Sequence, residues 1–334
     1  MKTILRLAVL AFAGIATLAF AGNALATQKL SVNQSTTSLT IKVSQAQTDA
    51  QPAKISIYVP TGYSINASAA PGTKIGATSG TVFSRDANIP LPLSGDVVVS
   101  ATSDAPTCDP VPHLAVWNLA LSVAGQNITL PVHVDQLAGP EAALGAYKLV
   151  VCLAPDDVPV GTPGRSPNGA RLLDATFTVN SIFTVPAGQS IWKTITTPWA
   201  GGVPNAAGTV ETRAFVANGT ATLAKKVNAG RRLVKFTGKV TQAGTAVSGA
   251  KVSLLVNGKT AGFSARTNAS GNFSIVLKKT GKKTTSTFQA RTTVAERDIT
   301  TTGCTSPTPN IPGGCVSATA SAFTAVSAKI RIRL

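Results

Sequence analysis

Apolar and polar residues alternate with a period of two in several short runs of the chain. This pattern occurs in residues 39–43 and 54–59, and it is typical of β-strands with one buried face. We expect residues 146–152 and 172–179 to form two further strands. Beyond the first 26 residues, no long run repeats apolar residues at helical spacing. The pattern therefore predicts an all-β protein.

Two further pairs of runs predict hairpins. Residues 114–123 and 128–134 are two mostly apolar runs on either side of a short turn. Residues 191–195 and 209–216 form the second pair and flank a loop rich in proline and glycine. We expect the two members of each pair to lie side by side in a sheet.

The clearest pattern lies between Phe236 and Leu277. Two alternating runs are joined by Asn257-Gly258, the favoured pair for a two-residue hairpin turn, and a turn at Ser270-Gly271 leads into a third run. The alternation predicts that these apolar residues face one core: Phe236, Val240, Val252, Leu254, Val256, Phe273, Ile275 and Leu277.

This last third of the chain resembles the carboxypeptidase-regulatory-like, or transthyretin-like, family of immunoglobulin-like domains found in secreted bacterial proteins. The resemblance rests on the hairpin that begins Gly249-Ala-Lys-Val and on the turn Ser270-Gly-Asn-Phe. It implies an immunoglobulin-like sandwich of about seven strands. The family is non-catalytic and is usually appended to other domains, so the resemblance implies no site residues. The N-terminal part shows no comparable resemblance.

The first 26 residues have the features of a secretory signal peptide. Lys2 and Arg6 form a charged head, residues 7–20 are almost entirely apolar, and Ala24-Leu-Ala26 is a cleavage site of small residues. A retained membrane anchor is the alternative, but the apolar run is short for a spanning helix. We therefore expect a protein that is secreted or held in the cell envelope, with no integral membrane span after cleavage.

These observations predict four segments. Residues 1–26 form the signal peptide, and residues 27–218 form an N-terminal β-sandwich domain that includes a Pro/Gly-rich terminal hairpin. Residues 219–232 form a basic linker, and residues 233–334 form the immunoglobulin-like β-sandwich domain. The fold class is therefore all-β with two β-sandwich domains, the C-terminal one immunoglobulin-like.

The chain has four cysteines, Cys108, Cys152, Cys304 and Cys315. An even number in an exported chain favours disulfide bonds. Of the three possible pairings we favour Cys108 with Cys152 and Cys304 with Cys315, because each bond then lies within one domain. A structural zinc site is the alternative, but no Cys-x-x-Cys spacing supports it.

Charge divides the chain into two unequal parts. Residues 27–210 hold nine basic and ten acidic side chains, whereas residues 211–334 hold nineteen basic and three acidic ones. A field of one sign attracts polyanions. The candidates for polyanion binding occupy outward strand positions or crowd one turn: Lys235, Lys239, Lys251, Lys278, Lys279, Lys282, Lys283, Arg291, Lys329, Arg331 and Arg333.

Two interpretations of this charge stay open. Lysines on strand edges and flat faces prevent association between sheets, and a high charge keeps an exported protein soluble. Alternatively, the basic domain binds an anionic polymer of the cell wall or surface, such as a phosphate polymer or an acidic polysaccharide. Nucleic acid is a disfavoured partner, because the chain is exported and this half has no Tyr or Trp for base stacking.

Few residues suit catalysis or metal binding. His113 and His133 are the only histidines, and together with Asp109 and Asp135 they form the one constellation in which a metal or acid–base site can be imagined. Gly-x-Ser-x-Gly, His-Glu-x-x-His and phosphate-binding glycine loops are absent from the sequence. We therefore predict a protein that is not an enzyme and has no cofactor.

Flat aromatic rings suggest a second binding function. Trp192 and Trp199 flank a Pro/Gly-rich loop and are candidates for stacking on sugars, whereas Trp117 lies among alternating apolar residues and is expected in a core. The sequence thus favours a structural or adhesive protein of the cell envelope, attached to anionic polymers by its cationic C-terminal sandwich. A carbohydrate-binding module protein is the alternative.

Overall fold

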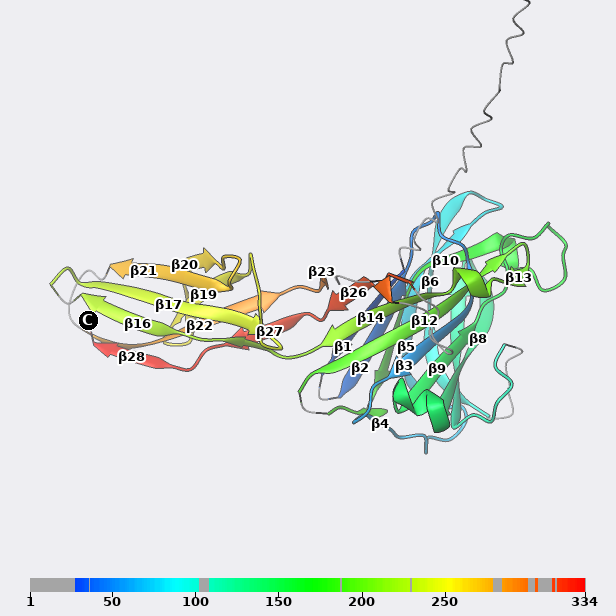
Figure 1. The fold of residues 1–334 in the computed structure, drawn as a ribbon, viewed down its shortest axis with the longest axis horizontal. Helices are drawn as coiled ribbons and strands as arrows, with labels where there is room; N and C mark the ends of the chain where they lie inside the picture. The colour runs from blue at the N-terminus through cyan, green and yellow to red at the C-terminus, as the bar shows by residue number, and fades with distance from the viewer. Residues whose placement is uncertain are drawn as a thin grey trace, which may run out of the picture.

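The computed structural model describes residues 28–35, 37–101, 108–186, 188–228, 230–278, 284–299, 304–305, 314–315 and 317–333. The described chain folds into strands and three 3₁₀ turns, which confirms the all-β prediction. Figure 1 shows two bodies end to end. We call the larger one, which contains β1 to β14, the proximal body, and the slender one, which begins at β15, the distal sandwich. Among the described residues, no helix has the length and apolar character needed to cross a membrane. The predicted signal peptide lies outside them.

One long sheet builds the proximal body. Its strands follow one another in the order β1-β2-β10-β5-β6-β7-β8-β9-β3-β12-β14-β26-β23, and β13 pairs with β12. Their bounds are β1 Lys29–Gln34, β2 Ser38–Ser44, β3 Pro52–Val59, β5 Lys74–Ser84, β6 Ile89–Ser100, β7 Ala115–Val123, β8 Gln126–Gln136, β9 Tyr147–Cys152, β10 Ala170–Asn180, β12 Ser190–Ala200, β13 Val203–Pro204, β14 Val210–Val216, β23 Arg297–Ile299 and β26 Ser317–Ala320.

The connections of this body contain a few short elements. The 3₁₀ turns are η1 Gly139–Ala143, η2 Pro167–Gly169 and η3 Ala206–Gly208. Two small ladders pair β4 Ser64–Ile65 with β11 Phe183–Thr184, and β24 Cys304–Thr305 with β25 Gly314–Cys315.

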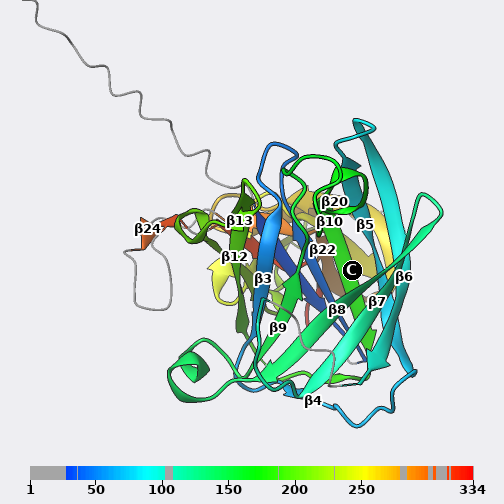
Figure 2. The same ribbon diagram turned by 90° about the vertical axis from the view of Figure 1, so that its right-hand side faces the viewer.

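The long sheet rolls around an apolar core, so that its strands surround a common interior (Figure 2). Edge strand β1 packs against β14, which brings the two ends of the roll together. Trp117 on β7 and Trp192 on β12 are buried in this core and pack around Phe183. Burial of large aromatic side chains supplies much of the stabilisation of such a core.

Both predicted hairpins of the proximal body are confirmed. Strands β7 and β8 pair antiparallel through a turn at Ala124 and Gly125, whose φ angles of 48° and 80° suit a primed hairpin turn. Strands β12 and β14 also pair antiparallel, with Thr194 opposite Thr212. Runs that flank a turn or a loop thus identified the correct partners in both cases.

The distal sandwich consists of two five-stranded sheets. One contains β15, β16, β17, β18 and β21, and the other contains β19, β20, β22, β27 and β28. Their bounds are β15 Gly219–Ala221, β16 Ala224–Asn228, β17 Leu233–Gln242, β18 Thr245–Ala246, β19 Lys251–Val256, β20 Lys259–Arg266, β21 Asn272–Lys278, β22 Thr285–Val294, β27 Phe323–Val326 and β28 Ile330–Arg333.

The core of this sandwich agrees with the alternation in the sequence. Six of the expected core residues are buried, and Val256 and Leu277 pack against them while partly buried. Phe236 and Phe288 bring their rings to 4.9 Å across the two sheets. Asn257 and Gly258 have φ angles of 50° and 81° and form the predicted turn between β19 and β20.

The structure differs from the predicted boundaries in two places. Residues 219–232 do not form a linker, because they contain β15 and β16, which pair with β17. The last third of the chain is not confined to the distal sandwich, because β23 and β26 return to the proximal sheet. These short strands gain backbone partners on β14 and on each other there, which local pattern could not reveal.

The chain consequently passes between the two bodies three times. Each connection lies between consecutive strands separated by two residues: β14 and β15, β22 and β23, and β26 and β27. Gln242 of β17 ties two of these connections together, since its buried amide nitrogen donates to the carbonyl oxygens of Ala217 and Ser321, both at 3.0 Å. The junction is therefore hydrogen-bonded as well as covalent.

The Cys108–Cys152 disulfide is confirmed, with a Cα–Cα distance of 6.1 Å. It fastens the segment before β7 to the end of β9. The backbone of Cys304 lies opposite that of Cys315 in the β24–β25 ladder. A disulfide between this second pair stays a prediction.

Candidate polyanion-binding surface

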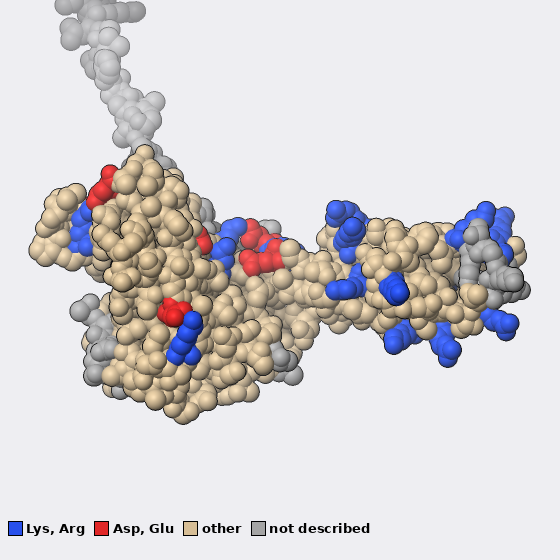
Figure 3. Space-filling view, turned by 180° about the vertical axis from the view of Figure 1, so that it is seen from behind, with Lys and Arg blue, Asp and Glu red and all other residues tan. Residues whose placement is uncertain are grey.

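The distal sandwich carries cations without any acidic side chain. No Asp or Glu occurs in residues 212–295 or 299–334. Two of the three acidic residues counted in the basic half, Glu296 and Asp298, contact β1 of the proximal body, and the third, Glu211, lies on β14. Figure 3 shows Lys and Arg over the distal sandwich, with Asp and Glu confined to the proximal body and the junction.

One outer face gathers four lysines from three neighbouring strands. Lys235 and Lys239 are two of the exposed outward residues of β17, and Lys278 lies on the same face of β21 because it is opposite Leu233. Lys226 of β16 lies directly opposite Lys235. We call these four residues the lysine face.

The pairing of Lys226 with Lys235 is electrostatically unfavourable. Directly opposite residues in an antiparallel ladder have Cβ atoms about 5 Å apart, and like charges at that spacing are destabilising. No carboxylate of the distal sandwich can screen them. An anion bound from outside would remove this repulsion.

A groove of about 630 Å³ adjoins the lysine face. Lys239 and Arg266 line it together with the polar side chains of Thr237, Asn268 and Asn272. It therefore presents two cationic groups beside hydroxyl and amide groups. Phosphate, sulfate and carboxylate groups are all recognised by such donors.

The groove depends on local backbone geometry. Gly238 forms part of its lining, and a Cβ atom there would lie 2.1 Å from the carbonyl oxygen of Thr222 and 2.6 Å from the ring of Phe273. A larger residue would therefore displace the strand that carries Lys239. The guanidinium of Arg266 donates a 2.8 Å hydrogen bond to the carbonyl oxygen of Gly249. A guanidinium has five N–H donors, so this bond leaves others for a ligand.

The opposite outer face holds a second group of cations. Exposed Lys251, Arg291, Arg331 and Arg333 all lie on the outward side of β19, β22 and β28. Lys251 is directly opposite Arg266 and repeats the like-charge pairing of the lysine face.

The predicted polyanion candidates are thus divided between two faces rather than joined in one. Lys235, Lys239 and Lys278 lie on one face, and Lys251, Arg291, Arg331 and Arg333 lie on the other. Lys329 is exposed between β27 and β28. Lys279, Lys282 and Lys283 lie outside the described residues.

Sequence reasoning missed Lys226 and Arg266. Lys226 belongs to the segment interpreted as a linker. Arg266 reaches its position because the β19–β20 register shifts between Ser253 and Leu255, near Gly262, whose φ angle is +75°. A glycine inside a predicted strand is the sequence signal that could have indicated this bulge.

The carbohydrate prediction is wrong for Trp192. Its side chain is completely buried, packs against Tyr63 at 5.1 Å and donates from Nε1 to the Tyr63 hydroxyl at 3.2 Å, so no sugar can reach its ring. Trp199 is half-buried and lines a groove of about 520 Å³ with Pro155 and Pro204. Its Nε1 donates to the Leu153 carbonyl oxygen at 2.9 Å, which fixes the ring orientation.

The histidines and nearby acidic residues form a buried charge network. His113 and Asp135 lie 2.6 Å apart between Nδ1 and Oδ1, and the Lys148 Nζ lies 3.2 Å from Asp109 and 3.4 Å from Glu141. Apart from Glu141, these groups are almost fully buried on the outer side of β8 and β9. Within the described part of the chain, no group of three metal-ligating residues is assembled.

The network perturbs two pKa values. Burial alone lowers the pKa of Lys148, but the negative charges of Asp109, Glu141 and Asp135 outweigh it and raise the pKa. Burial and the neighbouring Glu141 carboxylate, which accepts a 3.0 Å hydrogen bond from the phenol, raise the pKa of Tyr58 above its usual range. The cluster is therefore built around a protonated lysine and a neutral tyrosine, which suits a structural role.

The comparisons with known proteins identify no family. A scan against protein-family models finds no match, and a search of curated proteins finds no matching relative. Among solved structures, the D00–D0 domain of intimin matches with 14% identity over 62% of this chain and 90% of that chain, at a TM-score of 0.20.

Two bacterial adhesins also match. A Ca²⁺-stabilised, ice-binding adhesin of an Antarctic bacterium has 12% identity over 90% of this chain and 74% of its own, at a TM-score of 0.18. A 1.5-MDa bacterial ice-binding adhesin has 11% identity over 89% of this chain and 97% of its own, also at 0.18. Scores this low carry no argument about the function of this chain.

Proposed function

We propose that the chain is an exported attachment protein of the cell envelope whose distal sandwich binds anionic polymers. The observation that carries the proposal is the lysine face, where Lys226 and Lys235 oppose each other on a body without acidic side chains. The polymers that fit it carry repeated phosphate, sulfate or carboxylate groups. Neither catalysis nor a cofactor enters this function.

The arrangement of the cations supports this proposal over a purely solubilising role. Solubility requires net charge but no particular placement. Like charges directly across a ladder lower stability, by up to about 1 kcal/mol per pair. The groove beside Lys239 and Arg266 adds hydroxyl and amide donors that net charge alone does not require.

Binding of the full mature chain to dextran sulfate and to long-chain polyphosphate tests the proposal. The variant Lys226→Gln/Lys235→Gln removes two charges from the lysine face. The matched control Arg331→Gln/Arg333→Gln removes two charges from the opposite face. We expect the first variant to weaken binding about tenfold more than the second at low salt, and all affinities to fall steeply as salt increases.

Two outcomes would contradict the proposal. Equal losses in both variants would indicate a response to net charge alone. Retention that is equal at low and high salt would exclude electrostatic attachment. In cells, release of the protein from the surface by a salt wash supports attachment, whereas protein found only in the medium argues against it.

A carbohydrate-binding function is the second candidate, and the groove beside Trp199 favours it. A half-buried indole flanked by Pro155 and Pro204 offers a flat apolar surface of the kind on which sugar rings stack. Binding to insoluble polysaccharide that survives high salt and is lost in Trp199→Ala would support this function. Binding that is unchanged in Trp199→Ala would exclude it.

A further inference from the structure

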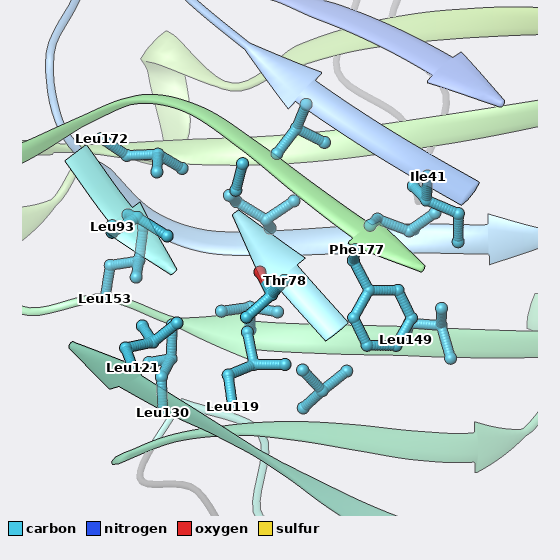
Figure 4. A pocket seen from close by; sticks show the side chains of 16 residues that line it. Ile41, Thr78, Leu93, Leu119, Leu121, Leu130, Leu149, Leu153, Leu172 and Phe177 are labelled. Atoms are coloured by element: carbon cyan, nitrogen blue, oxygen red, sulfur yellow. The ribbon is translucent and has the colours of Figure 1, made fainter. Parts of the chain in front are cut away.

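The interior of the proximal body contains a cavity of about 80 Å³. Sixteen residues line it, fifteen of them on eight strands of the roll and Leu153 just after β9 (Figure 4). All but one of the sixteen are apolar. A single water needs roughly 15 Å³ by this measure, so the space exceeds one water several-fold. Close-packed protein interiors rarely leave voids of this size.

Small residues on one side of the roll account for the space. Gly76 and Gly80 flank Thr78 on its side of β5, and Gly95 lies between Leu93 and Val97 on β6. A Cβ atom at any of these glycines would lie 1.9–2.1 Å from a carbonyl oxygen of the neighbouring strand, so these positions carry no side chain that could fill the space. Ala175 contributes another short side chain from β10. The larger lining residues on β7, β8 and β9 therefore face strands that offer little bulk.

Thr78 is the one polar residue of the lining. It is 4% exposed, and its hydroxyl has no hydrogen-bond partner among the described residues. Figure 4 shows this oxygen among the aliphatic side chains. A buried hydroxyl without a partner is unfavourable, so its retention indicates a partner that enters the cavity.

The cavity is approached from one end of the roll. Val43, Leu130, Leu153 and Leu172 are the lining residues near that end, where β2 and β9 finish and β8 and β10 begin, and all four are only half-buried. Phe177 lies farther from this end along β10 and stacks on Trp117 with ring centroids 5.9 Å apart. A ligand that enters here would reach this aromatic pair, so the fluorescence of Trp117 can be used to follow its binding.

We propose that the cavity binds a small neutral aliphatic molecule with a single hydroxyl or carbonyl oxygen, which forms a hydrogen bond with Thr78. The apolar lining matches an alkyl chain. A carboxylate is excluded from the interior because no lining residue carries a positive charge to compensate it. The volume of about 80 Å³ suits a chain of about five carbons, on the estimate that each occupies the roughly 15 Å³ needed by one water.

A series of linear alcohols from 1-butanol to 1-decanol tests the proposal on the intact protein, with intrinsic tryptophan fluorescence and thermal midpoint as readouts. We expect saturable binding whose affinity increases about fourfold per methylene until the chain fills the cavity, and then stops increasing. Hexanoate at neutral pH should bind far more weakly than 1-hexanol.

Substitutions at Thr78 separate a binding role from a structural one. Thr78→Val should weaken 1-hexanol binding about fivefold, leave 1-chlorohexane binding unchanged, and raise the thermal midpoint of the ligand-free protein. Thr78→Ser keeps the hydroxyl and should retain binding. Ala175→Leu fills the cavity and should abolish binding, whereas Val276→Thr, on an exposed apolar residue of the distal sandwich, should change nothing.

Three results would overturn the proposal: no saturable binding by the wild-type protein, unchanged alcohol binding in Ala175→Leu, or equal 1-hexanol affinity in Thr78→Val and wild type. Should Thr78→Val fail to fold, the comparison of Thr78→Ser with Ala175→Leu decides the question alone. None of these results depends on polymer binding by the distal sandwich.

Discussion

The two bodies of this protein treat charge in opposite ways. The proximal body pairs its charges internally, as in the network around Lys148 and in the contacts of buried Asp156 with Arg85 and Arg171. The distal sandwich exposes its lysines and arginines and contains no acidic side chain. Internal pairing compensates the buried charges of the proximal body, whereas an exposed field of one sign attracts oppositely charged groups.

The strongest test of this contrast is to apply the same substitution in both bodies. Lys148→Met should destabilise the proximal body by about 3–5 kcal/mol, because it leaves several buried carboxylates uncompensated. Lys42→Met, at an exposed position of β2, and Lys235→Met, on the lysine face, should each change stability by less than about 0.5 kcal/mol. Differential scanning calorimetry measures the stability of both bodies in each variant. Similar losses of stability in all three variants would contradict the contrast between the two bodies.

The next largest effect is expected at alkaline pH, which should lower the stability of the proximal body. The raised pKa values of Lys148 and Tyr58 in the folded state contribute stability that is complete below the unfolded values of about 10.4 and 10 and is lost as pH rises through the folded values. All three tryptophans lie in the proximal body, so their fluorescence follows its unfolding alone. Stability should fall above about pH 10.

Tyr58→Phe provides the control for this pH dependence. The variant has no phenol to ionise, so the decline in proximal stability above pH 10 should be smaller. An identical decline in the variant and the wild type would mean that Tyr58 makes no contribution to it.

The smallest expected effect concerns the opposed lysines. Lys235→Glu converts the repulsive pair with Lys226 into an attractive one and should stabilise the distal sandwich by about 0.5 kcal/mol. The same change should weaken binding to dextran sulfate. In a Lys226→Gln background the stabilisation should disappear, which calorimetry of the double-mutant cycle can measure. Persistence of the full gain there would show that the two lysines do not interact.

Local pattern predicted the features that depend on neighbouring residues. Turn and loop residues identified the hairpins, and alternation identified the apolar residues around Phe236 and Phe273. Strand faces and two-residue turns are encoded over a few positions. Burial of Trp192 was missed because the even-numbered residues of β12 face the core. Ile191 is 39% exposed and Trp192 is fully buried, and sequence alternation alone does not say which side faces the core.

Features that depend on distant partners could not be predicted. All five residues of β16 are exposed, so its sequence shows no alternation of buried apolar and exposed polar residues. Strands β23 and β26 are only three and four residues long. The lysine face and the groove combine residues from strands whose register is set by these pairings and by the bulge near Gly262. The cavity depends on which small residues oppose which large ones across a rolled sheet, and that requires the closed fold.

The three connections between the bodies also determine how the protein carries tension. If a polymer holds the distal sandwich while the proximal body is pulled away, the force divides over β14–β15, β22–β23 and β26–β27 instead of one tether. A single protease cut at one connection would leave the two bodies joined by the other two. A load applied to the cationic distal sandwich is therefore shared by three covalent connections to the proximal body.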